Sequence, residues 1–241
     1  MNRSHLPCPF TECGSSDAFS WNETEQIGKC HSCGRGYPSR ASIFDWARDD
    51  YPMKERKRVQ QRKITSCTYE GIRGISPDVC EMYGIQLQLD ENGTPVRYAF
   101  RYPNNVKYRG YDEKKFWLKD RGALNELFGA DFNAGTSNRL YLTEGEFDAA
   151  SLFEILGKSF PVKSLTSASI SDQFIKTNYE YMNAFKEIVY AGELDQAGKQ
   201  AAERLYEVFP DKFYYVAMSK HKDANEFLMA GDGNDLMWSA K

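Results

Sequence analysis

From residue 138 onward, strand-like and helix-like segments alternate along the chain, and this alternation is the strongest constraint on its fold. Short apolar runs rich in β-branched and aromatic residues alternate with longer segments whose apolar residues have helical spacing. The strand-like runs are 139–143, 161–166, 187–191 and 212–218, and the helix-like segments are 146–156, 171–185 and 197–209. Such alternation predicts an α/β fold in which helices pack on a mostly parallel sheet.

The N-terminal region carries a different signal, a cluster of cysteines. Four of the six cysteines of the chain lie there in two close pairs: Cys8 and Cys13, then Cys30 and Cys33. Zinc prefers four thiolate or imidazole ligands in a tetrahedron, and each pair can lie on a tight turn. The stretch between the pairs, with Phe19 and Trp21, suits a hairpin. We therefore predict a small zinc ribbon over residues 1–48, in which the four cysteines hold one structural zinc ion.

Two regions separate the cysteines from the alternating part. Residues 49–65 are polar and basic and predict a linker, because six of the ten residues in 54–63 are Lys or Arg. Such a run is expected to bind nucleic-acid phosphates without reading their sequence. Residues 66–137 mix short elements, with a helix predicted from Ser76 and Pro77 to Gly84 and three strand-like runs after it. We predict an α+β subdomain there.

Composition excludes only a few classes of protein. Hydrophobic residues at 41% and charged residues at 27% are typical of a globular chain. The sequence contains no run of 18 apolar residues and no apolar signal segment at its start. We therefore expect a cytoplasmic protein with no membrane partner.

Carboxylates follow three of the strand-like runs. Glu144 follows 139–143, Glu193 and Asp195 follow 187–191, and Asp223 follows 212–218 by a few residues. In open α/β sheets, functional groups gather at the carboxyl ends of the strands. Neighbouring acids repel one another unless cations bind them, and carboxylate oxygens suit Mg²⁺. The pattern predicts a magnesium site, although three unrelated helix N-caps would use the same residue types.

The segments TEGEFD, ELDQAG and KDANE, taken in this order, resemble the toprim signature. The four cysteines, the basic linker, RGIS at 73–76 and LFG at 127–129 also come in the order of T7-like bacteriophage primase-helicases. The resemblance covers nearly the whole chain and implies the primase portion of that family. It implies a primase domain over 66–241, with an N-terminal subdomain at 66–137 and a toprim core at 138–230. The chain departs from the family at Glu193, where aspartate is usual, and at Thr166–Ser169, where relatives often carry glycines.

This resemblance also implies a set of site residues. Mg²⁺ or Mn²⁺ would be bound by Glu144, Glu193, Asp195 and Asp223. Catalytic roles fall to Glu144, Asp195 and Asp223, with Glu144 either a metal ligand or a general base. Whether Glu193 or Asp195 binds the metal directly stays open. The implied nucleotide- and DNA-binding residues are Arg73, Lys107, Arg109, Lys114 and Lys119.

The implied function is that of a DNA primase, a nucleotidyltransferase. It would synthesise short RNA primers from NTPs on single-stranded DNA during phage DNA replication, in the host bacterial cytoplasm. A replicative helicase, fused or separate, and a DNA polymerase are the expected partners. One rival is a toprim nuclease or topoisomerase-like enzyme, although a topoisomerase needs a nucleophilic tyrosine on a further domain. Another is a non-catalytic DNA-binding recombination scaffold, which the retained acids disfavour.

Overall fold

The computed structural model describes residues 2–10, 12–37, 62–130, 136–167, 169–193, 195–216, 218 and 220–240. The chain divides into two compact units, Met1–Gln60 and Gln61–Lys241, and each is described by itself. The helix predicted at 41–48 and most of the basic run at 54–63 lie outside the described residues.

The first unit contains a small antiparallel sheet. Its strands, in spatial order, are β1 (Asn2–Leu6), β2 (Phe19–Asn22), β3 (Ile27–Cys30) and β4 (Gly36–Tyr37). Strands β2 and β3 form the predicted hairpin, with Phe19 opposite Cys30. The ring of Phe19 is buried against Gly28, where a Cβ atom would lie only 2.3 Å from its Cζ atom. With so small an apolar core, this unit needs a further link such as a metal ion.

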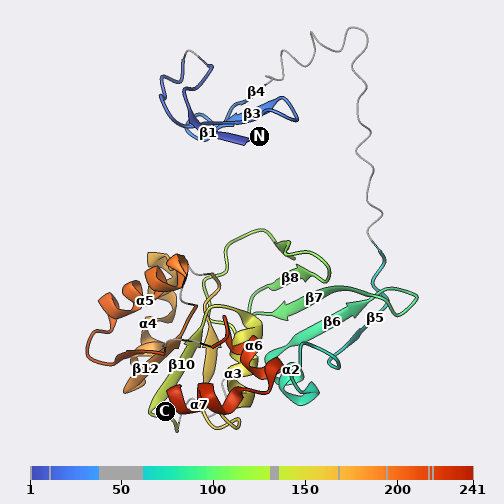
Figure 1. Cartoon of the computed structure of the whole chain (residues 1–241), viewed down its shortest axis with the longest axis vertical. Coiled ribbons are helices and arrows are strands. Elements are labelled where there is room, and N and C mark those ends of the chain that lie inside the picture. Colours follow the sequence, from blue (N-terminus) through green and yellow to red (C-terminus); the bar gives the residue numbers. More distant parts are fainter. Residues whose placement is uncertain are drawn as a thin grey trace. The chain divides into compact units, whose positions relative to one another are not determined.

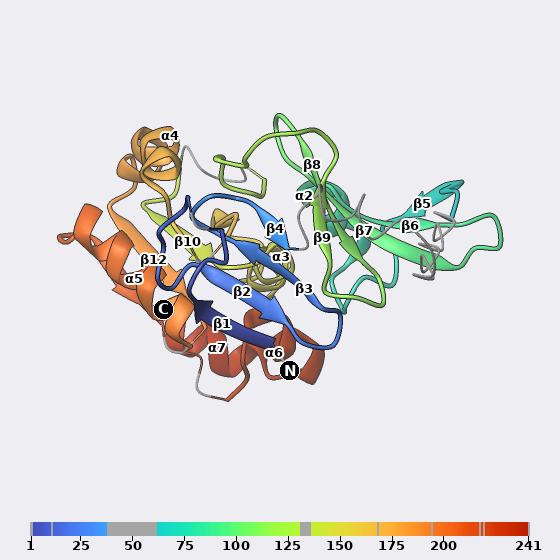
Figure 2. The same cartoon turned by 90° about the horizontal axis from the view of Figure 1, so that it is seen from above.

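The second unit begins with a five-stranded antiparallel sheet whose strands pair in chain order (Figure 2). They are β5 (Ser66–Thr68), β6 (Ile85–Leu89), β7 (Pro95–Arg101), β8 (Val106–Gly110) and β9 (Phe116–Leu118). Helix α2 (Pro77–Tyr83) precedes β6 and ends at Gly84 in the left-handed conformation. The predicted helix and three strands are therefore confirmed. Strands β5 and β9 were not predicted, because each is an edge strand of three residues and is too short to show a period.

A four-stranded parallel sheet forms the rest of this unit, and it confirms the α/β prediction. Its spatial order is β11 (Val162–Ser164), β10 (Arg139–Thr143), β12 (Glu187–Ala191) and β13 (Phe213–Tyr215). The helices are α3 (Glu146–Ile155), α4 (Asp172–Asn183), α5 (Gln196–Val208), α6 (Ala224–Ala230) and α7 (Gly233–Ala240). None of the helices described is long and apolar enough to cross a membrane.

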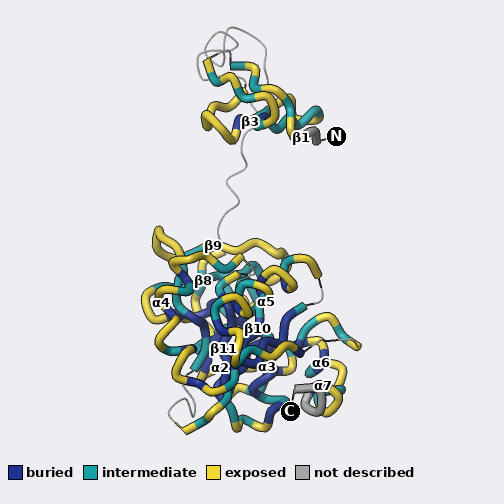
Figure 3. The backbone as a smooth tube through the Cα atoms, turned by 90° about the vertical axis from the view of Figure 1, so that its left-hand side faces the viewer, coloured by how far each residue is buried: buried dark blue, intermediate teal, exposed yellow. Residues whose placement is uncertain are grey.

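Helices cover both faces of the parallel sheet (Figure 1). Successive side chains of a strand point to opposite faces, so neighbours enter different cores. Leu140, Ile188 and Tyr190 pack with α4 and α5. Tyr141 and Val189 pack with α3 and α6 and with the antiparallel sheet. Figure 3 shows β10 and β11 as buried segments. Strands buried on both faces have continuous apolar sequences rather than alternating ones, which is the pattern of RLYLT and EIVYA.

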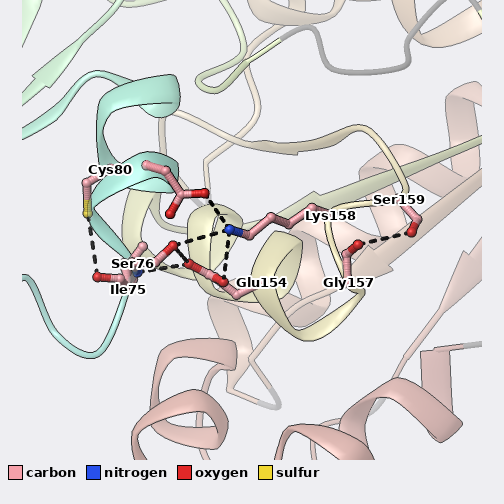
Figure 4. Close-up of polar contacts among 8 residues, drawn as sticks. Ile75, Ser76, Cys80, Glu154, Gly157, Lys158 and Ser159 are labelled. Atoms are coloured by element: carbon pink, nitrogen blue, oxygen red, sulfur yellow. Dashed lines mark hydrogen bonds and ion pairs between the residues drawn. The ribbon is translucent and has the colours of Figure 1, made fainter.

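Polar contacts tie α2 to α3 (Figure 4). The backbone N–H of Ser76 donates to Glu154 Oε1 at 2.8 Å, and its hydroxyl bonds to the same carboxylate. Ser76 therefore occupies the N-cap position without capping the helix with its side chain. Lys158 Nζ lies 2.6 Å from Asp78 Oδ2 and 3.8 Å from Glu154 Oε2. These contacts fix the antiparallel subdomain against the parallel sheet, and with it the position of the residues before Ser76.

Candidate metal centres and active site

The four clustered cysteines converge as the sequence predicts. Their sulfur atoms all lie within 4.8 Å of one another, with Cys8 Sγ 4.0 Å from Cys33 Sγ and Cys13 Sγ 3.7 Å from Cys30 Sγ. These separations are too long for disulfides, and all four thiols are free. A tetrahedron with Zn–S bonds of about 2.3 Å has sulfur atoms about 3.8 Å apart. The cluster therefore has the dimensions of a four-thiolate zinc site.

Electrostatics within this cluster also favour a cation. Hydrogen bonds from the backbone at Cys33 and Ser32 lower the pKa of Cys30 to about 7. Loss of hydration, with the neighbouring thiols, raises the pKa of Cys8 to about 12. Four such thiols cannot all ionise together unless a divalent ion offsets their charge. His31 is exposed and its Nε2 lies 3.1 Å from Ser20 Oγ, outside this ligand set.

The predicted acids occupy the carboxyl edge of the parallel sheet. Glu144 directly follows β10, and Glu193 and Asp195 follow β12, which pairs in parallel with β10. Asp223 comes after β13, the next parallel strand, and directly precedes α6. Parallel pairing places the carboxyl ends of all three strands at one edge, so the topology brings these residues to the same side of the sheet.

Two of these acids are also helix N-caps. Asp195 Oδ1 accepts from the N–H of Gly198 at 2.9 Å, and Asp223 Oδ1 accepts from the N–H of Glu226 at 2.8 Å. The capping interpretation is therefore correct for both aspartates. It does not exclude metal binding, because the second carboxylate oxygen of each has no hydrogen-bond partner among the described residues.

The acids are near one another without forming a tight ligand cluster. In the part of the chain that the structure describes, the cysteines are the one group of three or more His, Cys, Asp or Glu residues whose ligand atoms are arranged to hold a metal ion. Lys222 Nζ lies 3.0 Å from Glu193 Oε2 and offsets part of the negative charge. Burial and the charges of Glu193 and Asp195 raise the pKa of Glu144, against the hydrogen bonds that it accepts. The donor set fits Mg²⁺, which is bound by few carboxylates and shares its shell with water and phosphate.

Asp148, in the first turn of α3, belongs to this site but was not selected from the sequence. Its Oδ1 accepts from the N–H of Asn225 at 3.3 Å. Burial, together with the charges of Asp223 and Glu193, raises the pKa of Asp148 well above its usual range. Asp148 also suits an ordinary first turn of a helix, where acids are favourable, so the sequence alone offered no separate signal that it belongs to the site.

A basic group faces the acids from the antiparallel subdomain. Arg73 and Gly74 both have positive φ, at 50° and 77°, and form a tight turn between the bridged residues Ile72 and Ile75. Positive φ at both central positions is the mark of a type I′ turn, which ordinarily uses Asn or Gly. Arginine is strained there, so the conformation must be held by its surroundings. Asn225 Nδ2, from the first turn of α6, donates to the carbonyl of Arg73 at 3.0 Å.

The guanidinium groups of two arginines lie over the aromatic ring of Phe147. Arg73 Cζ lies 4.9 Å and Arg109 Cζ 5.4 Å from the centre of the Phe147 ring. Burial, together with the charge of Arg73, lowers the pKa of Arg109. Lys107 Nζ lies 2.7 Å from Glu146 Oε1, which also accepts from the hydroxyl of Tyr102 at 2.7 Å. Three of the five predicted basic residues therefore meet beside the TEGEFD segment.

The other two basic residues, Lys114 and Lys119, are exposed on either side of β9. A cavity of about 360 Å³ lies next to this strand. Its lining residues include Lys107, Phe116, Trp117, Asn125, Thr166 and Ser169. Thr166 and Ser169 belong to the loop that follows β11, so this cavity adjoins the same edge of the parallel sheet as the acids.

Comparisons with known proteins agree with this arrangement. Residues 141–228 match the family described as Toprim-like. The DNA helicase/primase of Enterobacteria phage T3 is 31% identical over 176 residues, which are 70% of this chain and 31% of that protein. The chain thus spans about a third of the length of this curated relative.

Two solved structures are also similar. The primase fragment of the bacteriophage T7 primase-helicase is 25% identical with a TM-score of 0.60, over 100% of this chain and 99% of that one. A chain from the structure of T7 lagging-strand DNA polymerase with primase domains bound to an RNA/DNA hybrid and dTTP is 28% identical. Its TM-score is 0.59, over 70% of this chain and 87% of that one.

The parallel sheet, its acidic edge and the four-cysteine ribbon define a toprim protein of the primase type. The chain is homologous to the primase portion of T7-like bacteriophage primase-helicases.

Proposed function

We propose that this chain is a DNA primase that synthesises short RNA primers from NTPs on single-stranded DNA. The observation that carries the proposal is that a group of carboxylates and a group of basic side chains lie beside each other at one edge of the parallel sheet. Carboxylates follow β10 and β12 there, and Arg73, Lys107 and Arg109 reach α3 beside them. A nucleoside triphosphate requires both, because divalent cations and basic side chains share the charge of its phosphates.

Each residue has a role in this proposal. Asp195 and Asp223, with Glu193, hold Mg²⁺, and Glu144 completes the ligand set or accepts the proton of the attacking 3′-hydroxyl. Bound Mg²⁺ supplies charge stabilisation at the triphosphate oxygens. The guanidinium groups of Arg73 and Arg109 suit phosphate oxygens as bidentate donors.

The remaining basic residues act outside this centre. Lys107 links the basic group to the acidic edge through Glu146, while Lys114 and Lys119 contact the nucleic-acid backbone. The cavity beside β9 has the size of a small-molecule site and is lined by Phe116 and Trp117, which suits a nucleobase.

We further propose how the parts of the chain divide the work. The zinc ribbon, residues 1–48, contacts the template, and the linker at 49–65 binds its phosphates. Residues 66–137 and the toprim core at 138–230 form the primase domain. The names of the relatives include a helicase and a DNA polymerase, and we infer partners of both kinds in the cytoplasm of a bacterial host.

The proposal is tested with random-sequence single-stranded DNA, labelled NTPs and Mg²⁺. We expect short RNA products that depend on template, on Mg²⁺ and on Asp195, with Asp195→Asn as the inactive control. Cleavage of the DNA without RNA synthesis would instead identify a nuclease. DNA binding with neither reaction would identify a non-catalytic scaffold.

A further inference from the structure

Tyr190 is an unusual residue for its position in the fold. Strand β12 has the sequence EIVYA, and its last four side chains are buried. Tyr190 is fully buried, on the face of the sheet that α4 and α5 cover. A phenol hydroxyl in such a core needs a hydrogen-bond partner, since an unpaired one costs the free energy of its lost hydration.

Its partner is the acid at the end of the neighbouring strand. Tyr190 Oη lies 3.1 Å from Glu144 Oε1, and the N–H of Glu193 donates to the same oxygen at 3.1 Å. An ionised carboxylate only accepts, so the tyrosine is the donor. The other oxygen, Glu144 Oε2, has no hydrogen-bond partner among the described residues.

Two glycines make this arrangement sterically possible. A Cβ atom at Gly192 would lie 2.3 Å from Tyr190 Cε1, so the ring fills the space that a side chain would take. A Cβ atom at Gly198 would lie 2.5 Å from Glu144 Oε1, so the carboxylate lies directly against the first turn of α5. Real Cβ atoms do not approach other atoms so closely. The ring and the carboxylate are therefore confined together, with Gly192 and Gly198 on either side.

We propose that Tyr190 is a positioning residue for Glu144. Together with the N–H of Glu193, its hydroxyl fixes Glu144 Oε1 against the protein and leaves Oε2 as the oxygen that meets a divalent cation or takes a proton. Tyr190 itself touches neither substrate nor metal. Residues that orient a metal ligand in this way commonly change affinity or activity by about 10- to 100-fold when they are replaced. This inference deepens the proposed function of the same site.

The direct test is Tyr190→Phe, which removes one oxygen and keeps the ring against Gly192. Mn²⁺ affinity is measured by electron paramagnetic resonance without nucleotide or DNA, and primer synthesis is measured separately. We expect Mn²⁺ binding about tenfold weaker and kcat about tenfold lower, with an unchanged KM for NTPs. Tyr141→Phe is the matched control. Tyr141 is also fully buried, in the neighbouring strand β10 and on the other face of the sheet, and its hydroxyl accepts from Arg139 Nη1 at 3.1 Å, so both quantities should stay as in the wild type.

A double-mutant cycle separates positioning from simple packing. If Tyr190 acts through Glu144, Tyr190→Phe should weaken Mn²⁺ binding no further once Glu144→Gln is present. Additive losses, or a lower thermal stability with unchanged Mn²⁺ affinity, would overturn the inference. Because Mn²⁺ binding needs no primer synthesis, a wild-type protein that makes no RNA would defeat only the proposed function. A wild type that makes RNA, with Tyr190→Phe equal to it in both assays, would defeat only the role of Tyr190.

Discussion

Asn225 connects the basic group to the acidic edge, and its replacement gives a sharp prediction. Its side chain is only 1% exposed, and Nδ2 donates to the carbonyl of Arg73 at 3.0 Å and to Ser151 Oγ at 2.9 Å. Asn225→Ala removes both of these hydrogen bonds. The carbonyl of Arg73 then loses the hydrogen bond that Asn225 donates to it. This matters because Arg73 has a φ of 50°, which arginine rarely adopts without such contacts.

The magnitude has two parts. Removing one partner from a buried hydrogen bond costs about 1–3 kcal/mol, so we expect a loss of about 2–4 kcal/mol in the free energy of unfolding. For a domain of this size that lowers Tm by roughly 6–12 °C. A left-handed non-glycine residue holds about 1–3 kcal/mol of strain, and relaxation of the turn releases it. This release offsets part of the loss, so the fall in Tm should lie at the lower end of that range. Arg73 would then leave Phe147, and we expect the KM for NTPs to rise about 5- to 10-fold.

Thermal unfolding measures the loss of stability, and steady-state primer synthesis separately measures the rise in the KM for NTPs. Tyr83→Phe is the control for lost stability alone, because Tyr83 is also buried and its hydroxyl donates to the carbonyl of Val162 at 2.9 Å, away from the cavity beside β9. It should lose about 1–3 kcal/mol of stability without a change in KM. If Asn225 acts through Arg73, the effects of Asn225→Ala and Arg73→Ala on KM should not add. An unchanged KM in Asn225→Ala, or additive effects, would refute this reasoning.

Three further predictions concern the metal centres. Metal analysis should find one zinc per chain, lost in Cys30→Ser, and this variant should lose template-directed synthesis but retain some untemplated extension, since the zinc module is separate from the acids. Asp195→Asn and Asp223→Asn should each abolish primer synthesis while gel-shift assays still detect DNA binding. Glu193→Asp should remain active across a Mg²⁺ titration, because it keeps the charge and shortens the side chain by about 1.5 Å. If Glu193→Ala made no primers while Asp195→Asn made them at a near-normal rate, Glu193 rather than Asp195 would be the direct metal ligand.

The sequence predicted the architecture well where local patterns are long. Strands such as EIVYA and helices such as α5 show their period within one segment, so the alternation and the parallel sheet followed directly. Short elements were missed because a segment of a few residues is too short to show a period. Strands β5 and β9 have three residues each, and α6 has seven, so their formation depends on neighbours rather than on their own sequence.

The site was predictable only in part. The acids after β10 and β12 were found because strand ends are visible in sequence. Their supporting residues were not, because the contacts join distant segments: Asn225 and Arg73 are 152 residues apart, and Tyr190 and Glu144 are 46 apart. A tyrosine inside an apolar strand was the available signal at Tyr190, but nothing in the sequence identified its partner.

The double role of the aspartates explains how the acidic edge can persist without a cation. Each capping aspartate lies at a helix N-terminus, where the free N–H groups and the helix dipole favour negative charge. Asparagine caps helices about as well as aspartate, so Asp195→Asn should keep the hydrogen bond to Gly198 and nearly all of the folding free energy. It would nevertheless lose the anionic oxygen that Mg²⁺ requires. A variant that unfolds at the wild-type temperature but makes no primers would therefore separate the metal role of Asp195 from its role as a cap. A fall in Tm of many degrees would instead make capping the main function of this residue.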